Sequence, residues 1–253
     1  MAVTRSPTRA EPWTSKASHS WREFLIEIGT IICGILIALG LEQVAEWAHW
    51  QEKAHAARTS IHKELTRAYV LAEERIAQRD CANAYLDQLA ADVESSPAVW
   101  RPRNTAWCGI ATVFHYRSIG GRPWPTEVWR SIEAEGVVSH FGEDYRAKAP
   151  FIFNFIDTIR AMGVEEMYLA PELDPLRRPL VLTPDGKLRL LSTIARLRRL
   201  NINLALTSRQ LQAEIARLDP PGAAELEADR AAIPNFLSRA GIMLNPQPTS
   251  APR

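Results

Sequence analysis

The feature that most constrains this chain is an apolar stretch near its N-terminus, FLIEIGTIICGILIALGL, at residues 24–41. These eighteen residues hold one charged side chain, Glu27. As an α-helix they would span about 27 Å, close to the hydrocarbon thickness of a bilayer. Glu27 lies about one turn inside the N-terminal boundary, where a carboxylate reaches water or is neutral. We therefore predict a transmembrane anchor over residues 23–41.

Tryptophans flank the predicted span on both sides. Trp21 precedes it, and Trp47 and Trp50 follow it. Indole rings concentrate at the headgroup level of membranes, so all three are predicted interface residues. Two alternatives stay open, a cleaved signal peptide ending near Leu39 and a buried core helix. The long polar region before the span argues against the first, and the lack of a polar face argues against the second.

Basic residues around the span predict its orientation. Four precede it and only two follow within twenty positions: Arg5, Arg9, Lys16 and Arg22, then Lys53 and Arg58. Positive charge next to a membrane helix stays on the cytoplasmic side. We expect residues 1–22 to form a disordered cytoplasmic tail, the anchor to lie in a bacterial inner membrane, and the rest of the chain to lie in the periplasm.

One face of the anchor carries small residues at intervals of three and four. This predicted packing face consists of Glu27, Thr30, Gly34 and Ala38. Small residues at that spacing let two membrane helices approach closely, and a carboxyl group there can hydrogen-bond across the contact. The pattern indicates a possible homodimer. The alternative is that such residues are simply common in membrane helices.

Charge beyond the anchor is distributed unevenly, although the chain as a whole carries a formal net charge of +1. Residues 42–95 hold ten acidic and six basic side chains, and residues 177–218 hold nine basic and two acidic ones. The near-neutral total gives no reason to expect nucleic acid as a partner. The asymmetry indicates either two helices that attract each other within the fold or a basic face for anionic lipid or a partner.

An all-α domain is predicted for residues 42–221, built as a coiled-coil-like bundle. A long helix, with an interruption near Asp80, should fill the stretch between Leu41 and Pro97, which lacks helix breakers. A second helix should begin at Thr183 and end before Asp219. Its apolar seam alternates steps of four and three: Leu190, Ile194, Leu197, Asn201, Leu204, Ser208, Leu211, Ile215 and Leu218.

Asn201 and Ser208 form a polar part of this seam, where a buried amide favours one register. The seam's partner is either the acidic helix of the same chain or a second copy of itself. Between the two helices, Thr126 should cap a short helix that ends at Gly136. A further helix should be kinked at Pro150 and cross the core, with Asn154 and Asp157 as buried polar groups.

Residues 96–125 read as an irregular aromatic loop with one short strand near Thr112–Tyr116. Trp and Arg dominate binding hot spots, and this region is rich in both. It is therefore a possible partner surface, formed by Trp100, Arg101, Arg103, Trp107, Arg117, Arg122, Trp124 and Trp129. The alternative is a loop whose aromatic rings pack back onto the helices. Residues 222–253 are predicted to be a short helix and a flexible tail.

Cys81 and Cys108 are the cysteines outside the membrane segment. In an oxidising compartment such a pair is predicted to form a disulfide, which would stabilise the fold by about 3 kcal/mol. Two separate buried thiols are the alternative. Cys33 lies in the apolar span and is expected to be inert.

Candidate chemistry is weak in this sequence. Glu52, His55 and His62 share a helical face, but a di-iron bundle needs a second E-x-x-H motif, which does not occur. His140 lies near Ser131, Ser139, Glu143 and Asp144 without a nucleophile elbow, metalloprotease motif or phosphate-binding loop. We therefore predict no catalytic, cofactor-binding or metal-binding residues and an interaction or scaffold role. The alternatives are an accessory subunit of an ion-driven complex that uses Glu27 and a periplasmic hydrolase.

The runs IEIGTIICGILIALGLEQVAEWAHWQEK and PTEVWRSIEAEGVVSHF resemble an uncharacterised bacterial family with an N-terminal anchor and a helical remainder, a domain of unknown function. The resemblance is strongest at the GILIAL core of the anchor and looser over residues 42–170, and residues 96–123 depart from the pattern. It implies the architecture and brings no activity, cofactor or catalytic residue.

Overall fold

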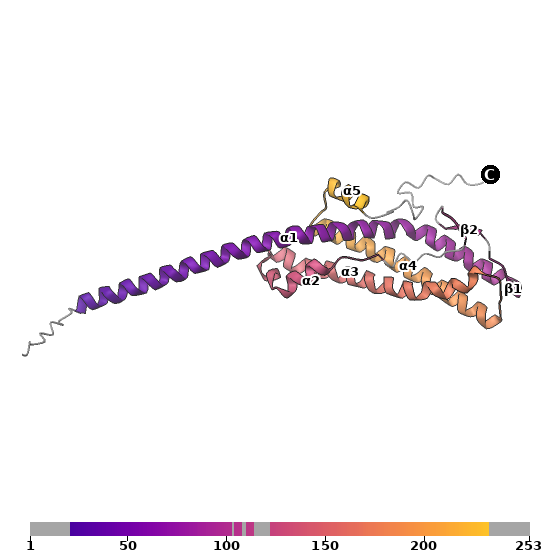
Figure 1. Cartoon of the computed structure of the whole chain (residues 1–253), viewed down its shortest axis with the longest axis horizontal. Coiled ribbons are helices and arrows are strands. Elements are labelled where there is room, and N and C mark those ends of the chain that lie inside the picture. Colours follow the sequence, from indigo (N-terminus) through magenta and orange to yellow (C-terminus); the bar gives the residue numbers. More distant parts are fainter. Residues whose placement is uncertain (1–20, 103, 108–109, 114–121, 233–253) are drawn as a thin grey trace, which may run out of the picture. The chain divides into compact units, whose positions relative to one another are not determined.

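A computed structural model describes residues 21–102, 104–107, 110–113 and 122–232. The described chain is almost entirely helical, which confirms the all-α prediction (Figure 1). It divides into two compact units between Gln51 and Glu52. The long helix α1, Trp21–Ser95, contributes to both, and the predicted interruption near Asp80 is wrong because α1 continues through it.

The first unit, as far as it is described, consists of α1 up to Gln51. Its side chains are exposed along the apolar span, including every residue of 23–41. Within the described residues, this is the stretch of helix that is long and apolar enough to cross a membrane. Thr30 donates its hydroxyl to the carbonyl of Ile26 at 2.8 Å, as a hydroxyl without other partners does within a helix.

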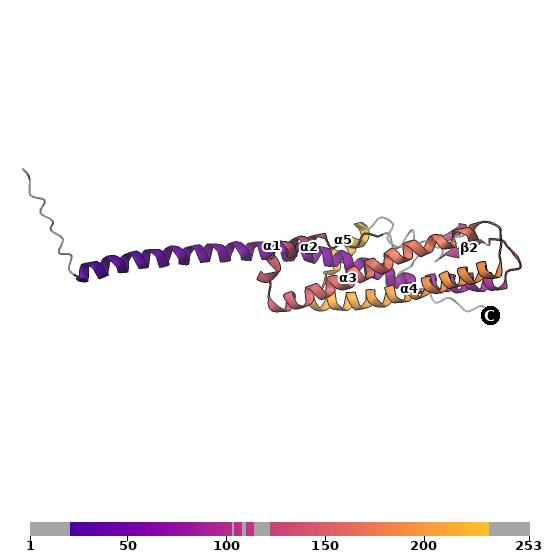
Figure 2. The same cartoon turned by 90° about the horizontal axis from the view of Figure 1, so that it is seen from below.

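The second unit is a bundle of three long helices: α1 from Glu52 onward, α3 (Glu143–Leu169) and α4 (Pro184–Leu218) (Figures 1 and 2). Contacts along the bundle set the directions of its helices. Arg75 of α1 pairs with Glu166 of α3, whereas Tyr69 lies opposite Gln212 of α4. Arg58 lies beside Tyr145 and Arg75 beside Glu166, so α3 runs parallel to α1. Tyr69 contacts Gln212 and Asp87 contacts Arg198, so α4 runs antiparallel to α1.

The helix α4 follows its sequence signals closely. Thr183 accepts a hydrogen bond from the backbone N–H of Gly186 at 3.1 Å, Pro184 opens the helix, and the helix ends at Leu218. The heptad positions Leu190 to Ile215 are buried, and Leu218 is half-buried. The side-chain amide of Asn201 donates to the carbonyl of Arg79 at 2.9 Å and to Oδ1 of Asn83 at 2.8 Å. The seam therefore has the acidic helix of the same chain as a partner.

Two short strand pairs replace part of the predicted irregular loop. The strands β2 (Asn104–Trp107) and β3 (Ile110–Val113) form an antiparallel hairpin. The strand predicted near Thr112–Tyr116 thus begins earlier, and Tyr116 lies outside the described residues. The strands β1 (Val99–Trp100) and β4 (Leu180–Val181) pair at the end of the bundle where α1 ends and α4 begins.

Trp100 anchors this end of the bundle. Its ring is 3% exposed, and its indole N–H donates to the carbonyl of Leu176 at 2.8 Å. Leu176 belongs to the 3₁₀ helix η2, Ala170–Arg177, which joins α3 to β4. Trp100 belongs to one cluster of buried apolar residues with members from α1, η2 and α4, among them Leu86, Leu89, Val93, Leu173, Leu190, Ile194 and Leu197.

The helix α2, Glu127–Ala134, is capped from another helix and not by its own N-cap residue. Thr126 occupies the cap position as predicted, but its hydroxyl accepts a hydrogen bond from Arg160. The orphan N–H groups of Val128 and Trp129 instead donate to the carboxylate of Glu64 on α1, at 3.0 and 2.9 Å. After α2, Gly136 adopts φ 73°, the left-handed conformation predicted for it, and leads into η1, Val137–His140.

Pro150 lies inside α3, which continues through it, and the predicted kink there stays a prediction. The prediction that this part of the helix crosses the core, with Asn154 and Asp157 buried, is wrong. Residues 151–159 form an amphipathic stretch, in which Ile152, Phe153 and Ile156 are buried and Phe151 is exposed. Asn154 and Asp157 are exposed too, and Asp157 pairs with Arg130 of α2 at 3.0 Å.

Candidate functional site

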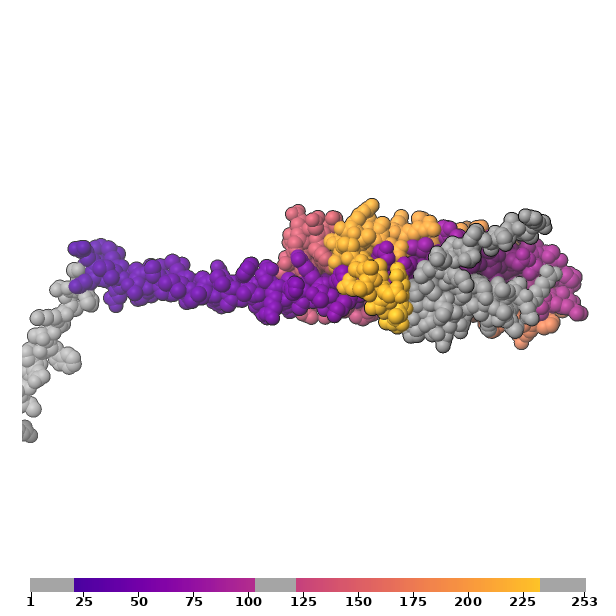
Figure 3. Space-filling view, turned by 90° about the horizontal axis from the view of Figure 1, so that it is seen from above, coloured from indigo at the N-terminus to yellow at the C-terminus, as the bar shows by residue number. Residues whose placement is uncertain are grey.

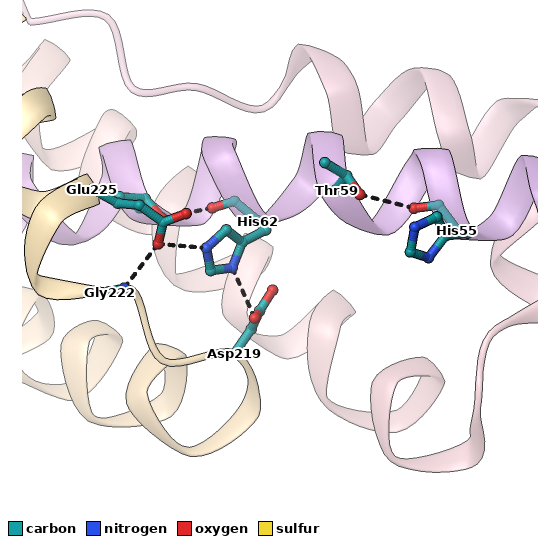
Figure 4. A network of polar contacts seen from close by, with 7 residues as sticks. His55, Thr59, His62, Asp219, Gly222 and Glu225 are labelled. Carbon is teal, nitrogen blue, oxygen red and sulfur yellow. Dashed lines mark hydrogen bonds and ion pairs between the residues drawn. The ribbon is translucent and has the colours of Figure 1, made fainter.

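The most concentrated cluster of titratable side chains lies where α1, the end of α4 and α5 (Ala223–Ala232) meet. His62 of α1 is held between two carboxylates (Figure 4). Its Nδ1 lies 2.8 Å from Oδ1 of Asp219, the residue that follows α4, and its Nε2 lies 3.0 Å from Oε2 of Glu225 in the first turn of α5. The same oxygen of Glu225 accepts the backbone N–H of Gly222 at 2.8 Å. We call these residues, His62, Asp219 and Glu225, the His62 clamp.

The hydrogen bonds of the clamp raise the pKa of His62 and lower that of Glu225. Partial burial lowers the pKa of His62, but the hydrogen bonds to Glu225 and Asp219 outweigh it, so the pKa lies above its usual value. The hydrogen bond from His62 lowers the pKa of Glu225 in turn. When its ring is protonated, His62 can donate from both nitrogens, one to each carboxylate of the clamp.

Further charged pairs extend the clamp along α5. Arg230 donates to both carboxylate oxygens of Glu73, at 2.7 and 2.9 Å, and Arg67 lies 3.6 Å from Asp229. No described residue of α5 is buried. In the space-filling view α5 lies against the surface of α1 (Figure 3). Ion pairs, and not apolar burial, therefore hold α5 in place.

Two aromatic rings lie beside the clamp, Phe141 just before α3 and Tyr145 in its first turn. The guanidinium of Arg58 stands over the rings of Phe141 and Tyr145, at 5.4 and 5.7 Å from their centres. Burial, and secondarily the charge of Asp219, raises the pKa of Tyr145. Its buried hydroxyl has no hydrogen-bond partner among the described residues. The phenol therefore stays protonated at any physiological pH.

This arrangement is suited to holding elements together and not to chemistry. Both nitrogens of His62 are occupied, so the ring cannot take a proton from a substrate without breaking one of its own contacts. Among the described residues no group of three or more His, Cys, Asp or Glu is placed to hold a metal ion. Glu52 and His55, predicted on the same face as His62, are exposed and do not join the clamp.

The residues near His140 do not assemble into a catalytic group either. Ser131 donates to Glu135 at 3.1 Å, and Ser139 donates to the carbonyl of Gly136 at 2.7 Å. Both serines thus serve local turns of the chain. His140 itself is exposed at the end of η1.

The predicted partner surface needs correction, because three of its tryptophans belong to the core. Trp100, Trp124 and Trp129 are 3%, 6% and 4% exposed. Trp129 stacks on Phe153 with the ring centres 4.8 Å apart. The alternative prediction, rings packed onto the helices, describes these three residues.

The arginines of that predicted surface differ from one another. Arg122 donates to the buried carboxylate of Glu74 at 2.6 Å, whereas Arg101 is exposed. Arg103, Arg117 and the side chain of Trp107 lie outside the described residues.

Other predicted site residues lie as follows. Trp21 and Trp47 are exposed and Trp50 is half-buried. Glu27, Thr30, Gly34 and Ala38 are all exposed, and a side chain added at Gly34 would meet no atom within 4 Å. Cys81 is disulfide-bonded and Cys33 is a free thiol. Cys108, its predicted partner, lies outside the described residues, so that pairing stays a prediction.

The His62 clamp was missed at the sequence level because its parts are far apart in the chain. His62 and Asp219 are separated by 157 residues. Only the antiparallel return of α4 brings them together.

No family model, curated protein or solved structure matches the chain.

Proposed function

We propose that this protein is a single-pass bacterial inner-membrane protein whose helical domain lies in the periplasm and acts by binding another macromolecule, not by catalysis. The exposed apolar span of α1 carries this proposal. A soluble protein does not leave a run of isoleucines and leucines such as Ile31, Ile35 and Leu39 open to water, because exposed apolar patches of that size drive association.

The tryptophans support the same conclusion. Trp21 and Trp47 are 71% and 65% exposed. They are twenty-six residues apart on one helix, which corresponds to about 39 Å along its axis. A bilayer with its headgroup regions is about 40–45 Å thick. Both rings therefore fit the two interfaces when the span between them lies in lipid.

The polar residues of the bundle support an interaction role. Each of the carboxylates of Glu64, Glu74 and Glu166 is engaged by groups of another element. The most concentrated titratable cluster, the His62 clamp, has both of its ring nitrogens occupied. Charged groups of the bundle are used to join helices, which is what a scaffold requires.

Membrane fractionation tests the anchor directly. We expect the full-length chain, expressed in a Gram-negative host, to stay in the membrane pellet after an alkaline carbonate wash. The variant Ile32→Lys/Ile35→Lys should move to the soluble or aggregated fraction, because two charges in mid-span oppose insertion. The control variant Val181→Lys, which adds a charge at an exposed position of β4, should remain in the pellet. Release of the unchanged chain by the wash would refute the anchor.

Orientation is tested with a C-terminal alkaline phosphatase fusion, which is active only in the periplasm. We expect activity in intact cells. Activity of a cytosolic reporter at the same position would instead place the bundle in the cytoplasm.

Glu27 favours one second candidate, an accessory subunit of an ion-driven complex. It is a carboxyl group on the exposed apolar span, the kind of residue that marks ion pathways in membranes. Glu27→Gln should then abolish the activity of the complex while leaving fractionation unchanged. If the anchor only holds the domain in place, the same substitution will be silent.

A further inference from the structure

The outer face of α4 has a one-sided charge. Between Gly186 and Ala213 the helix carries six basic residues and no acidic one. Part of this charge serves the fold. Arg198 donates to Asp87 of α1 at 2.6 Å, and the ammonium group of Lys187 donates to the carbonyl of Ser96 at 2.5 Å. These contacts with α1 and with Ser96, the residue after it, account for the charges of Arg198 and Lys187.

Three other arginines of α4 make no such contact. Arg189, Arg199 and Arg209 are exposed. In the part of the chain that the structure describes, none of them forms an ion pair. The pKa of Asp80 is lowered mainly by its hydrogen bond to Arg79, and the charge of Arg209 adds to this. Arg189 and Arg199 make no ion pair among the described residues.

Apolar side chains share one exposed face of α4 with two of these arginines. The face follows steps of four and three, and every member of it is exposed: Leu188, Ser192, Ala195, Arg199, Ile202, Leu206, Arg209 and Ala213. We call it the outer stripe. Its large apolar members, Leu188, Ile202 and Leu206, are 66%, 38% and 54% exposed. Exposed apolar residues on one helix face are anchors that a partner helix can cover.

A cleft opens at the start of this face. It has a volume of about 520 Å³ and is lined by Glu172 of η2 and by Arg189, Ser192, Thr193 and Arg196 of α4, with Leu190 below. The carboxylate of Glu172 is held by the hydroxyl of Thr193 at 2.5 Å, and Arg196 reaches Glu165 of α3 at 3.3 Å. Arg189 is thus the cation of the cleft that is available to an incoming carboxylate.

We propose that the outer stripe of α4 docks an acidic amphipathic helix of a second protein, which lies along α4 as a fourth helix. Apolar residues of that helix cover Leu188, Ile202 and Leu206, and its carboxylates pair with Arg189, Arg199 and Arg209. This proposal deepens the interaction role proposed above and rests on it, but it does not depend on which side of the membrane the bundle lies.

Charge selects this occupant over two others. A second copy docked through the same stripe would bring Arg199 and Arg209 against arginines, so like charges oppose a homodimer here. A flat anionic bilayer pairs well with basic residues that flank an apolar face. Here Arg199 and Arg209 lie within the stripe, where a bilayer would have to desolvate them, whereas glutamates of a helix can meet them directly.

The test uses the full-length protein in nanodiscs of uncharged lipid. The probe is a fluorescent synthetic helix as long as the outer stripe, with leucine at heptad positions a and d and glutamate at e and g. We expect binding by fluorescence anisotropy that weakens with salt. Arg199→Glu/Arg209→Glu should weaken it about tenfold or more. The control Lys63→Glu/Arg146→Glu changes the net charge equally at exposed positions away from the stripe and should leave affinity unchanged.

Five results would overturn the proposal. The first is no binding of the probe, and the second is an equal loss of affinity in the two double variants. The third is equal binding of a peptide with the same composition in scrambled order, because simple charge attraction would then suffice. The fourth is a dimer, detected by sedimentation, that Leu206→Glu converts to a monomer. The fifth is binding of the protein to phosphatidylglycerol vesicles that is abolished in the outer-stripe variants, while those variants still bind the probe. None of these five results depends on how the protein fractionates with membranes. An error in the outer-stripe proposal can therefore be distinguished from an error in the anchor proposal.

Discussion

Both ring nitrogens of His62 lie within hydrogen-bond distance of a carboxylate, and we predict that this makes the docking of α5 dependent on pH. The raised pKa of His62 means that its stabilising contribution is fully present below the ordinary value of 6.5 and is lost as pH rises through the folded value. The lowered pKa of Glu225 means that its contribution is present above the ordinary value of 4.5 and is lost as pH falls through the folded value. Docking is therefore strongest in the mildly acidic range between them.

Hydrogen exchange checks this prediction. Amides of α5, corrected for intrinsic exchange rates, should be protected about two- to fivefold more at pH 6 than at pH 9. In His62→Gln the difference should disappear, because glutamine does not titrate. The hydrogen bonds from Arg230 to Glu73 do not involve His62 and keep α5 in place at the higher pH. Equal protection at both pH values in the unchanged protein would contradict the prediction.

The buried pair of Arg75 and Glu166 is a different kind of residue-scale feature. Both side chains are almost fully enclosed, and their opposite charges lie in direct contact. Removing one partner leaves an uncompensated charge in the bundle, so Arg75→Met should lower the free energy of unfolding by about 3–5 kcal/mol. The double variant Arg75→Met/Glu166→Leu should recover most of that loss, since it removes both charges. Urea unfolding measures all three proteins, and an additive loss in the double variant would refute the coupling.

At the scale of elements, α2 shows a helix that depends on its neighbour for its first turn. Glu64→Ala should lower stability by about 1–3 kcal/mol, because two backbone N–H groups lose their acceptor. Exchange of the amides of Val128 and Trp129 should rise first. Glu133→Ala, at an exposed site of α2, is the control and should change stability little. Equal effects of the two substitutions would contradict a capping role for Glu64.

The same elements show what the sequence could predict. The start and end of α4 followed from Thr183, Pro184 and Asp219, because capping and proline chemistry are local. The continuity of α1 was underestimated at Asp80, since a solvent-facing charge interrupts a pattern without interrupting a helix. The burial of Trp100 was not predictable from its surroundings in sequence, because its cluster also includes η2 and α4, and its indole N–H bonds to Leu176 of η2. Glu64 as a cap and the His62 clamp were missed for the same reason, long separation along the chain.

For the whole molecule, the seam on α4 and the outer stripe on the same helix have different uses. The seam is buried against the rest of the bundle, and Asn201 ties it to α1. The outer stripe repeats the period of the seam on a face that the described fold leaves exposed. If the outer stripe binds a partner helix as proposed, α4 uses one face for its own bundle and the opposite face for the partner.

The disulfide at Cys81 connects the fold to the compartment proposed for it. If the bundle is periplasmic and Cys108 is the partner, the Cys33→Ser chain should resist alkylation until it is reduced. In Cys33→Ser/Cys81→Ser, Cys108 should react without reductant, which controls for access of the reagent. Reduction should also lower stability by about 3 kcal/mol, because the closed loop restricts the unfolded chain. Free reactivity of both cysteines in cells would contradict the pairing and, with it, an oxidising environment for the bundle.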